Sequence, residues 1–434
     1  MQQLTFTSFF RKIYPMKKSV YIATLGCKLN RFESDALSES LRASGFDIAR
    51  KLEDADTVVV NTCTVTNQAD ARSRGILRKA KRMGKFTVAT GCYATADYDE
   101  LSRSDFADLV LGNTNKFRLA EFLGSAAAET MDADFPQITS FERTRAYIKI
   151  QDGCGKFCSY CRIPYARGKS RSLAPERILT AARGLIANGY KEIVLTGVNI
   201  SDYRHGDMRL ARLTGSLLDL DGDFRLRLSS LQPDEFETEL IDYLGHPRFT
   251  DHFHISLQSG SGGVLERMNR HYTPDYFLGL TARIRDKKPD CGLTTDIIVG
   301  FPGETDEEFA ETVSLTRAAG FTRAHLFPYS PRKGTRAARM KDVHGNVKSE
   351  RETRLREIYL DTAKDFIARH VIGKPQRALI ENITNGTANG YTSNYLRIFF
   401  PADGHRTNSF VNVVPDRMAA AKDWSVDLYG AAAD

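Results

Sequence analysis

The stretch Gly153-Cys154-Gly155-Lys156-Phe157-Cys158-Ser159-Tyr160-Cys161 places three thiols on one short loop, at spacings of four and three residues. A tetrahedral zinc site needs four ligands, which usually come as two spaced pairs. Three cysteines with no fourth Cys or His beside them favour a 4Fe–4S cluster in which one iron keeps an open position. An iron without a protein ligand can hold a substrate or cofactor. The stretch therefore predicts a metal centre, with three packed structural thiols as the alternative.

Size and composition are those of a soluble globular protein. The chain has 434 residues, enough for roughly two to four domains. It is 41% apolar and 26% charged, and no apolar run approaches the roughly 18 residues of a membrane span. Residues 1–16 lack the apolar segment and cleavage site of a signal peptide. We expect them to form a flexible extension, with Met16 as a candidate start.

The cysteines also bear on the compartment. There are seven of them, without even pairing, which argues against a secreted disulfide scaffold in a chain of this length. A reducing cytoplasm is the simpler location, and an oxygen-sensitive cluster would require it. We therefore expect a cytoplasmic protein with no membrane partner.

The net charge of +7 is concentrated in two stretches. Residues 143–172 hold eight Lys or Arg and one acid, and residues 332–377 hold thirteen basic and six acidic residues, so each carries +7. The remainder of the chain is therefore acidic. Two local basic stretches on an acidic body indicate a surface for a polyanion, with solvated helix faces as the alternative.

Three further cysteines follow buried strands in the first part of the chain. The expected strands are Val20–Leu25, Thr57–Asn61 and Phe86–Thr90, and helical patterns separate them. This alternation predicts a parallel sheet, whose strands end at one edge. Cys27, Cys63 and Cys92 each stand just beyond a strand, so they should meet at that edge, where such sheets build their sites. The alternatives are a shared metal site and three buried structural thiols.

The middle of the chain predicts a partial barrel. After a linker over residues 125–142, strand and helix patterns alternate to residue 371. The expected strands are Ala146–Gln151, Glu192–Thr196, Arg225–Ser229, His252–Leu257, Thr294–Val299 and Ala324–Pro328. Six βα units are fewer than the eight of a closed TIM barrel, so we expect an open (β/α)6 arrangement with functional loops at the strand carboxyl ends. The open side would admit a bulky substrate.

The C-terminal part, residues 372–434, changes character. A long helix, Ser349–Val371, precedes short β runs at residues 376–381, 390–400 and 410–414, which predict a small β-barrel. Its basic and aromatic residues suit contact with nucleic acid, and packing inside the barrel is the alternative. They are Arg377, Tyr391, Tyr395 and Arg397. The whole chain is then α/β: an N-terminal parallel-sheet domain (17–124), a central partial barrel (143–371) and a small all-β barrel.

These motifs resemble those of a known enzyme family. Cys154-x3-Cys158-x2-Cys161 is similar to the radical S-adenosylmethionine (SAM) signature, and the contexts of Cys27, Cys63 and Cys92 resemble its methylthiotransferase branch. The C-terminal module resembles the TRAM domain that ends those enzymes. Within the branch, Gly26-Cys27-Lys28-Leu29-Asn30 and Leu195-Thr-Gly-Val-Asn199 are similar to the threonylcarbamoyladenosine tRNA enzymes. The isopentenyladenosine enzymes more often carry Gln-Met-Asn after the first cysteine, and a ribosomal-protein branch is the third option.

The resemblance implies two 4Fe–4S clusters and SAM as methyl donor and radical source. Cys154, Cys158 and Cys161 would hold the radical-generating cluster, and Cys27, Cys63 and Cys92 the auxiliary cluster that carries the inserted sulfur. The product would be the 2-methylthio form of an adenosine beside the anticodon. Both clusters must then face one cavity. A non-enzymatic iron–sulfur RNA-binding sensor is the alternative from another class, and Cys291 is expected to be a plain buried thiol.

The same resemblance assigns contacts and partners. The positions expected to bind SAM are Tyr160, Thr196, Gly197, Asn199, Ser230, Gln258, Asp296, Gly300 and Glu304. The residues expected to bind RNA are Arg167, Lys169, Arg171, Arg332, Lys333, Arg336, Arg339, Tyr391 and Tyr395. The expected partners are a tRNA anticodon stem-loop, an electron donor of flavodoxin or ferredoxin type, and a sulfur donor.

Overall fold

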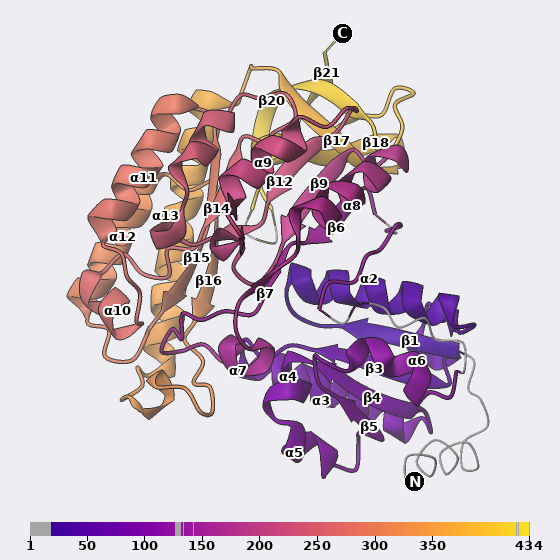
Figure 1. Ribbon diagram of the computed structural model, residues 1–434. Helices are drawn as coiled ribbons and strands as arrows, with labels where there is room; N and C mark the ends of the chain where they lie inside the picture. The colour runs from indigo at the N-terminus through magenta and orange to yellow at the C-terminus, as the bar shows by residue number, and fades with distance from the viewer. Residues whose placement is uncertain are drawn as a thin grey trace.

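Three parts follow one another along the chain (Figure 1). The computed structural model describes residues 19–125, 132, 134–141, 143–421, 423 and 425–433. The expected extension over residues 1–16 lies outside these ranges, as does part of the expected linker. The domain boundaries stay predictions. No helix in the described ranges combines the length and the apolar character that crossing a bilayer requires.

The N-terminal part is a five-stranded parallel sheet in the order β2-β1-β3-β4-β5. Its strands are β1 (Ser19–Thr24), β2 (Asp47–Ile48), β3 (Thr57–Thr62), β4 (Phe86–Gly91) and β5 (Leu109–Leu111). Its helices are α2 (Lys28–Ala43), α3 (Asn67–Arg82), α4 (Cys92–Ala96), α5 (Tyr98–Ser102) and α6 (Leu119–Phe122). The three predicted strands are confirmed. Helix α2 begins at Lys28, directly after Cys27, and Leu29 and Phe32 belong to its buried face.

The central part contains parallel strands in two sheets, β12-β9-β6 and β13-β14-β15-β16. The strands are β6 (Arg145–Lys149), β9 (Glu192–Thr196), β12 (Arg225–Leu228), β13 (Ser230–Leu231), β14 (His252–Ile255), β15 (Gly292–Val299) and β16 (Arg323–Pro328). Helices α8 (Pro175–Ala187), α9 (Leu210–Leu218), α11 (Pro274–Lys287), α12 (Asp306–Ala319) and α13 (Gly345–His370) surround them. Shorter elements are β7 (Gln151–Asp152), α7 (Ile163–Arg167), β8 (Arg171–Ser172), β10 (Arg204–His205), β11 (Met208–Arg209) and α10 (Gly262–Arg267). The prediction of an α/β chain with parallel sheets is confirmed.

The C-terminal part is a closed barrel in the order β17-β18-β19-β21-β20. Its strands are β17 (Gln376–Thr384), β18 (Thr387–Thr392), β19 (Arg397–Pro401), β20 (Phe410–Ala420) and β21 (Val426–Ala432). The expected run 390–400 divides into two strands at a turn, and β21 was not predicted. The likeness of this barrel to a TRAM domain stays a prediction.

The C-terminal barrel closes the amino ends of the central strands, opposite α7 (Figure 1). Arg225, the first residue of β12, donates from Nη2 to the carbonyl of Tyr391 over 2.9 Å. At Gly292, the start of β15, an added Cβ would lie 2.0 Å from the carbonyl oxygen of Asn394. Only glycine therefore permits this close approach, and the turn between β18 and β19 forms a floor under the central strands.

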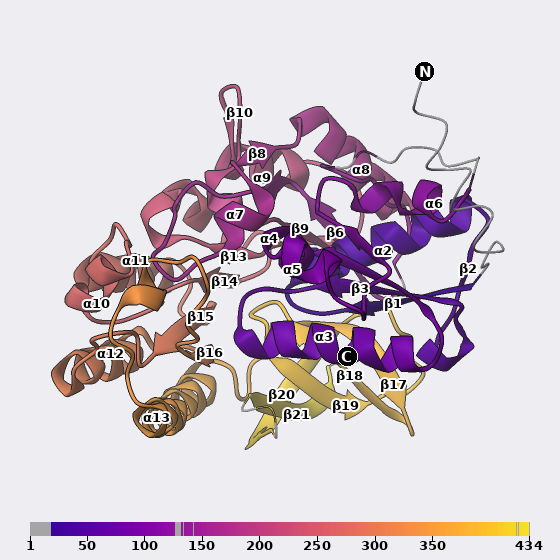
Figure 2. The same ribbon diagram turned by 90° about the horizontal axis from the view of Figure 1, so that it is seen from below.

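The N-terminal part packs against the side of the central part formed by β6 and β9. Phe32 of α2 shares one buried apolar cluster with Tyr147 of β6 and Val194 of β9. Helix α4 lies beside α7 in both views (Figures 1 and 2). Helix α2 therefore covers this side of the central strands, and Lys28 at its amino end lies close to Tyr395 of the C-terminal barrel. The partial (β/α)6 barrel stays a prediction.

Candidate active site between the two cysteine groups

The loop with Cys154, Cys158 and Cys161 joins β7 to α7 and is anchored at several points. The Cys154 amide donates to the carbonyl of Gly168 over 3.0 Å. The Ser159 amide donates to Met268 over 2.9 Å, and its carbonyl accepts from the Ala337 amide over 2.8 Å. The loop is thus held by segments that follow β14 and β16, at the carboxyl end of the central strands.

Hydrogen-bond donors approach the sulfur atoms of this loop. The Ile163 amide lies 3.4 Å from Cys161 Sγ, and Arg270 Nη1 lies 3.6 Å from Cys158 Sγ. Burial raises the pKa of the Cys161 thiol to about 12, and the neighbouring thiols add to the shift. A thiolate here consequently needs a positive metal centre, and N–H donors to sulfur are what iron–sulfur clusters use.

Cys27, Cys63 and Cys92 meet at one edge of the N-terminal sheet, as predicted. Asn30 Oδ1 lies 4.0 Å from both Cys27 Sγ and Cys92 Sγ. At Gly26, where φ is +98°, an added Cβ would lie 2.7 Å from Cys63 Sγ. Glycine is required there for its backbone conformation and for space.

The donor sets fit clusters better than single ions. In the described ranges, the one group of His, Cys, Asp and Glu whose ligand atoms lie within 4.8 Å of one another is His254, Asp296 and His325. Neither cysteine group is that compact, whereas sulfur atoms on a single zinc ion are separated by roughly 4 Å. The wider spacing, together with the absence of a fourth Cys or His beside either group, agrees with a multi-iron cluster.

Arg167 connects the two cysteine groups, and the expectation that it contacts RNA is wrong. It is 5% exposed. Its Nε donates to Cys92 Sγ over 3.2 Å, Nη2 to Glu33 over 2.8 Å, and Nη1 to Asp152 over 3.0 Å. All its donor nitrogens have partners inside the protein, so none is available to a phosphate.

A buried charge network surrounds Arg167. Glu33 of α2 pairs with Lys116 over 2.6 Å and with Lys149 of β6 over 3.3 Å. Burial would raise the pKa of Glu33, but Arg167 and Lys116 hold it well below its usual range. Burial lowers the pKa of Lys116 to about 8. The network fixes the N-terminal sheet against the central strands. The edge of the sheet that carries Cys27, Cys63 and Cys92 therefore lies on the same side as the loop with Cys154.

The other residues expected to bind RNA divide into three groups. Arg332 is buried and bonded to Asp70 and Thr64 of the N-terminal part, so its expected RNA contact is wrong. Tyr391 and Tyr395 lie at the floor, where their rings stack at 4.9 Å, and they face the central strands rather than the surface. The exposed residues are Lys169, Arg171, Lys333, Arg336 and Arg339. These remain candidates.

The residues expected to bind SAM lie mostly at strand carboxyl ends. Thr196 ends β9, Ser230 begins β13, and Gln258 follows β14 with φ +65°. Gly197 and Asn199 stand just beyond β9, and Asn199 Nδ2 donates to Glu235 over 2.7 Å. Tyr160 packs edge-on against Phe301 at 6.4 Å, between the cysteine loop and the end of β15.

Glu304 is a buried residue that holds the loop after β15. It accepts from the Gly300 amide over 2.7 Å, and pairs with Arg351 of α13 over 2.7 Å. Its Oε2 is occupied in holding the loop, whereas its buried Oε1 has no hydrogen-bond partner in the described ranges. The expectation that Glu304 contacts SAM therefore stays a prediction. Gly300 has φ +65° and forms the turn that Glu304 caps.

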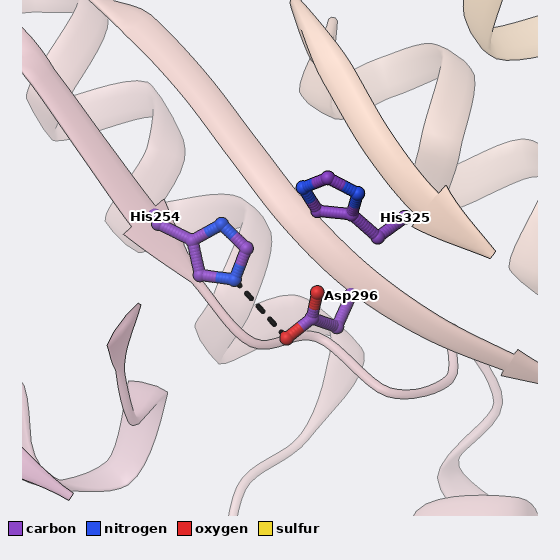
Figure 3. A group of neighbouring side chains, drawn as sticks. All are labelled: His254, Asp296 and His325. Atoms are coloured by element: carbon purple, nitrogen blue, oxygen red, sulfur yellow. Dashed lines mark hydrogen bonds and ion pairs between the residues drawn. The ribbon is translucent and has the colours of Figure 1, made fainter. Parts of the chain in front are cut away.

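Sequence reasoning named Asp296 as a SAM-binding position but missed the two histidines that lie beside it between strands β14, β15 and β16. Figure 3 shows His254, Asp296 and His325 pointing toward one another from these strands. The alternation His252-Phe253-His254 was a usable signal, since it places both imidazoles on one face of a strand. Lys28 was also overlooked, because its position beside Tyr395 depends on how α2 packs.

The comparisons with known proteins agree with this geometry. Residues 148–316 match the Radical SAM superfamily model, and residues 19–112 match the uncharacterized protein family UPF0004. The fold resembles that of the radical S-adenosylmethionine methyltransferase TsrM from Kitasatospora setae, with a TM-score of 0.54, 16% identity, and 74% of this chain and 77% of that one covered.

Curated relatives extend over almost the whole chain. It is 36% identical to threonylcarbamoyladenosine tRNA methylthiotransferase MtaB of Bacillus subtilis, over 91% of this chain and 93% of that protein. The MtaB protein of Thermotoga maritima is also 36% identical, over 91% and 94%. The tRNA-2-methylthio-N6-dimethylallyladenosine synthase of Bacillus pumilus is 34% identical, over 94% and 85%. With two cysteine groups placed as described and relatives of this identity and coverage, the chain belongs to the radical SAM methylthiotransferase family.

Proposed function

We propose that this enzyme inserts a methylthio group at C2 of N6-threonylcarbamoyladenosine next to the anticodon of tRNA. The observation that carries the proposal is the pairing of two cysteine groups across one domain interface, with Arg167 bonded to Cys92 of one group from the helix that follows the other. Relatives named for this substrate, at 36% identity, support the choice of nucleoside.

The chain would hold two 4Fe–4S clusters, one at Cys154, Cys158 and Cys161 and one at Cys27, Cys63 and Cys92. When bound, the first supplies the electron that cleaves SAM to a carbon radical, and the second supplies the sulfur. An aromatic C–H is too inert for acid–base attack at neutral pH, so the protein's task is to bind, orient and exclude water. Helix α2 and the floor turn perform the last task, because they cover the side formed by β6 and β9 and the amino ends of the strands.

The partners follow from the chemistry. A tRNA anticodon loop presents unstacked bases and phosphates, which suit exposed cations around the cysteine loop. Lys333 and Arg336 are exposed just beyond β16, and Lys169 is exposed just after α7. An electron donor of flavodoxin or ferredoxin type and a sulfur donor would complete turnover.

The test is mass spectrometry of tRNA nucleosides from a strain that lacks the gene. Loss of the 2-methylthio form of threonylcarbamoyladenosine, with its precursor accumulating, is the expected result. Loss of the isopentenyl counterpart would instead favour the second candidate, which rests on the dimethylallyladenosine synthases at 34% identity. Unchanged tRNA would point to a ribosomal protein as substrate. Absence of 5′-deoxyadenosine with reconstituted, reduced enzyme would favour an iron–sulfur sensor.

A further inference from the structure

The interior cluster His254, Asp296 and His325 lies directly below the Cys154 loop. Asp296 of β15 and His325 of β16 are paired across adjacent strands (Figure 3). Ile298, two residues further along β15, packs with Tyr160 of the cysteine loop. Two residues along a strand span roughly 6.6 Å, so Asp296 lies about this distance from Ile298, toward the amino end of β15 and away from the cysteine loop. A substrate between the cysteine groups would therefore meet this cluster.

The charge of Asp296 is already engaged. His254 Nε2 lies 3.1 Å from Asp296 Oδ2, and its Nδ1 lies 2.9 Å from the hydroxyl of Thr294. His325 is different: it is exposed and has no hydrogen-bond partner in the described ranges. Partial loss of contact with water, together with the charges of His254, Arg323 and Lys28, lowers the pKa of His325 to about 4, and the charge of Asp296 opposes this shift. His325 is thus a neutral imidazole with free nitrogen atoms that face the interior.

Lys28 is an unpaired cation at the same place. It follows Cys27 directly, begins α2, and is exposed. Its Nζ lies 5.8 Å from the ring centroid of Tyr395, and no carboxylate of the described ranges forms an ion pair with it. Burial would raise the pKa of Asp296, but nearby positive groups, Lys28 among them, lower it. The charge of Lys28 therefore acts on the Asp296–His325 pair.

Two other cations near the turn between β18 and β19 have acidic partners. Arg145 pairs with Glu381, and Arg227 donates to Glu192 over 2.8 Å. Lys28, by contrast, can accept a new anionic partner. A ligand that covers Lys28 displaces water from its ammonium group, which costs free energy unless the ligand provides a hydrogen-bonding partner. This position therefore favours a ligand with a negative charge.

We propose that Lys28, with His325 beside it, binds the carboxylate of the threonylcarbamoyl group and so selects this nucleoside against the isopentenyl one. The inference rests on the proposed function and assigns its specificity. The isopentenyl group is apolar and would leave Lys28 and His325 desolvated without partners.

The test compares Lys28→Gln with the wild type on anticodon stem-loop RNAs. One RNA carries threonylcarbamoyladenosine, a second its amide, in which the carboxylate is neutral, and a third isopentenyladenosine. We expect the wild-type holoenzyme to bind the acid roughly 10- to 100-fold more tightly than the amide, which is typical of one charge-assisted contact. Lys28→Gln should remove that ratio and raise KM for the acid, with a smaller change in kcat. Lys28→Arg should restore most of the ratio.

The matched control is Lys51→Gln, an exposed lysine just before residues 52–54, at the opposite end of the N-terminal sheet from the cysteine edge. It should keep the wild-type ratio. Because Lys28 adjoins Cys27, iron content and the electron paramagnetic resonance spectrum establish that each variant holds both clusters. An undiminished acid-to-amide ratio in Lys28→Gln overturns the inference. Wild-type enzyme that modifies only the isopentenyl RNA overturns the proposed function itself.

Discussion

Arg167 Nε donates a hydrogen bond to Cys92 Sγ over 3.2 Å, which joins the helix after one cysteine group to a thiol of the other. The same guanidinium bonds Glu33 and Asp152, which are both buried. It is therefore both a sulfur donor contact and the centre of the interface between the N-terminal and central parts.

Arg167→Gln should destabilise the fold and alter the auxiliary site. Removing the guanidinium leaves two buried carboxylates short of a partner, which costs about 3–5 kcal/mol. The loss of a positive donor to sulfur should also shift the auxiliary cluster to lower reduction potential. Denaturant unfolding and a redox titration followed by electron paramagnetic resonance measure the two effects.

Arg118→Gln is the matched control for that change. Arg118 is 48% exposed and pairs with Glu121 over 2.8 Å. A surface pair of this kind contributes about 0–1 kcal/mol, so stability should be nearly unchanged. If Arg167→Gln unfolds at the same denaturant concentration as Arg118→Gln, the buried network does not hold the interface.

The two cysteine groups should separate by function. Cys158→Ala should abolish SAM cleavage, because it removes a ligand of the radical-generating cluster. Cys63→Ala should keep cleavage and lose sulfur insertion, because its thiol belongs to the other group. Chromatography of 5′-deoxyadenosine alongside nucleoside mass spectrometry distinguishes them, and equal loss of both products in Cys63→Ala would contradict the division of roles.

The double variant Arg336→Ala, Arg339→Ala should bind tRNA less tightly than the wild type, and its binding should depend less on salt concentration. Both residues are exposed beside Ala337, whose amide bonds the cysteine loop at Ser159. Loss of two phosphate contacts to a single-stranded loop should reduce the slope of log K against log salt by about 1.4. The control pair, Arg183→Ala with Arg212→Ala, lies on outer helices α8 and α9 and should leave the slope intact. An unchanged slope in the first pair would remove it from the RNA surface.

Tyr395 should add stability in the alkaline range. Burial would raise the pKa of its phenol, but Lys28, Arg145 and Arg227 outweigh burial and lower the pKa to about 8. The folded state therefore prefers the phenolate, whose contribution is complete above the unfolded pKa near 10 and is lost as pH falls through 8.

Tyr395→Phe has no phenol to ionise and therefore lacks the phenolate's contribution to the free energy of unfolding. The difference in unfolding free energy between wild type and Tyr395→Phe should widen from pH 8 to pH 10 by about 2 kcal/mol. Ultraviolet absorbance of the phenolate provides an independent titration of the same group. A constant difference across this range would show that the nearby cations do not favour the charged form.

The sequence predicted the elements that repeat a local pattern. Inner strands such as β3 contain short apolar runs, and a cysteine shortly after three of the strands identifies the functional edge, because parallel strands end together. β21 was missed since Gly430, Ala431 and Ala432 have little strand preference, and the strand depends on pairing with β19 and β20.

Local sequence patterns could not predict ion pairs between residues that are far apart in the sequence. Arg167 and Arg332 were interpreted as surface cations because lysine and arginine are usually exposed. Their carboxylate partners, Glu33 and Asp70, lie far away in sequence on other elements. The role of Tyr395 likewise depends on a domain contact, so its aromatic character alone suggested RNA.

The floor turn between β18 and β19 has a consequence for the modularity of the enzyme. Asn394 donates to the Asp290 carbonyl, and the Tyr395 ring packs against His252 at 4.7 Å, so the last barrel covers the amino ends of the central strands. The C-terminal barrel therefore cannot be exchanged for another domain without changing the central part. A chimera with a different nucleic-acid-binding barrel could regain tRNA affinity and still lose the reaction, since the turn between β18 and β19 would no longer cover the amino ends of the central strands.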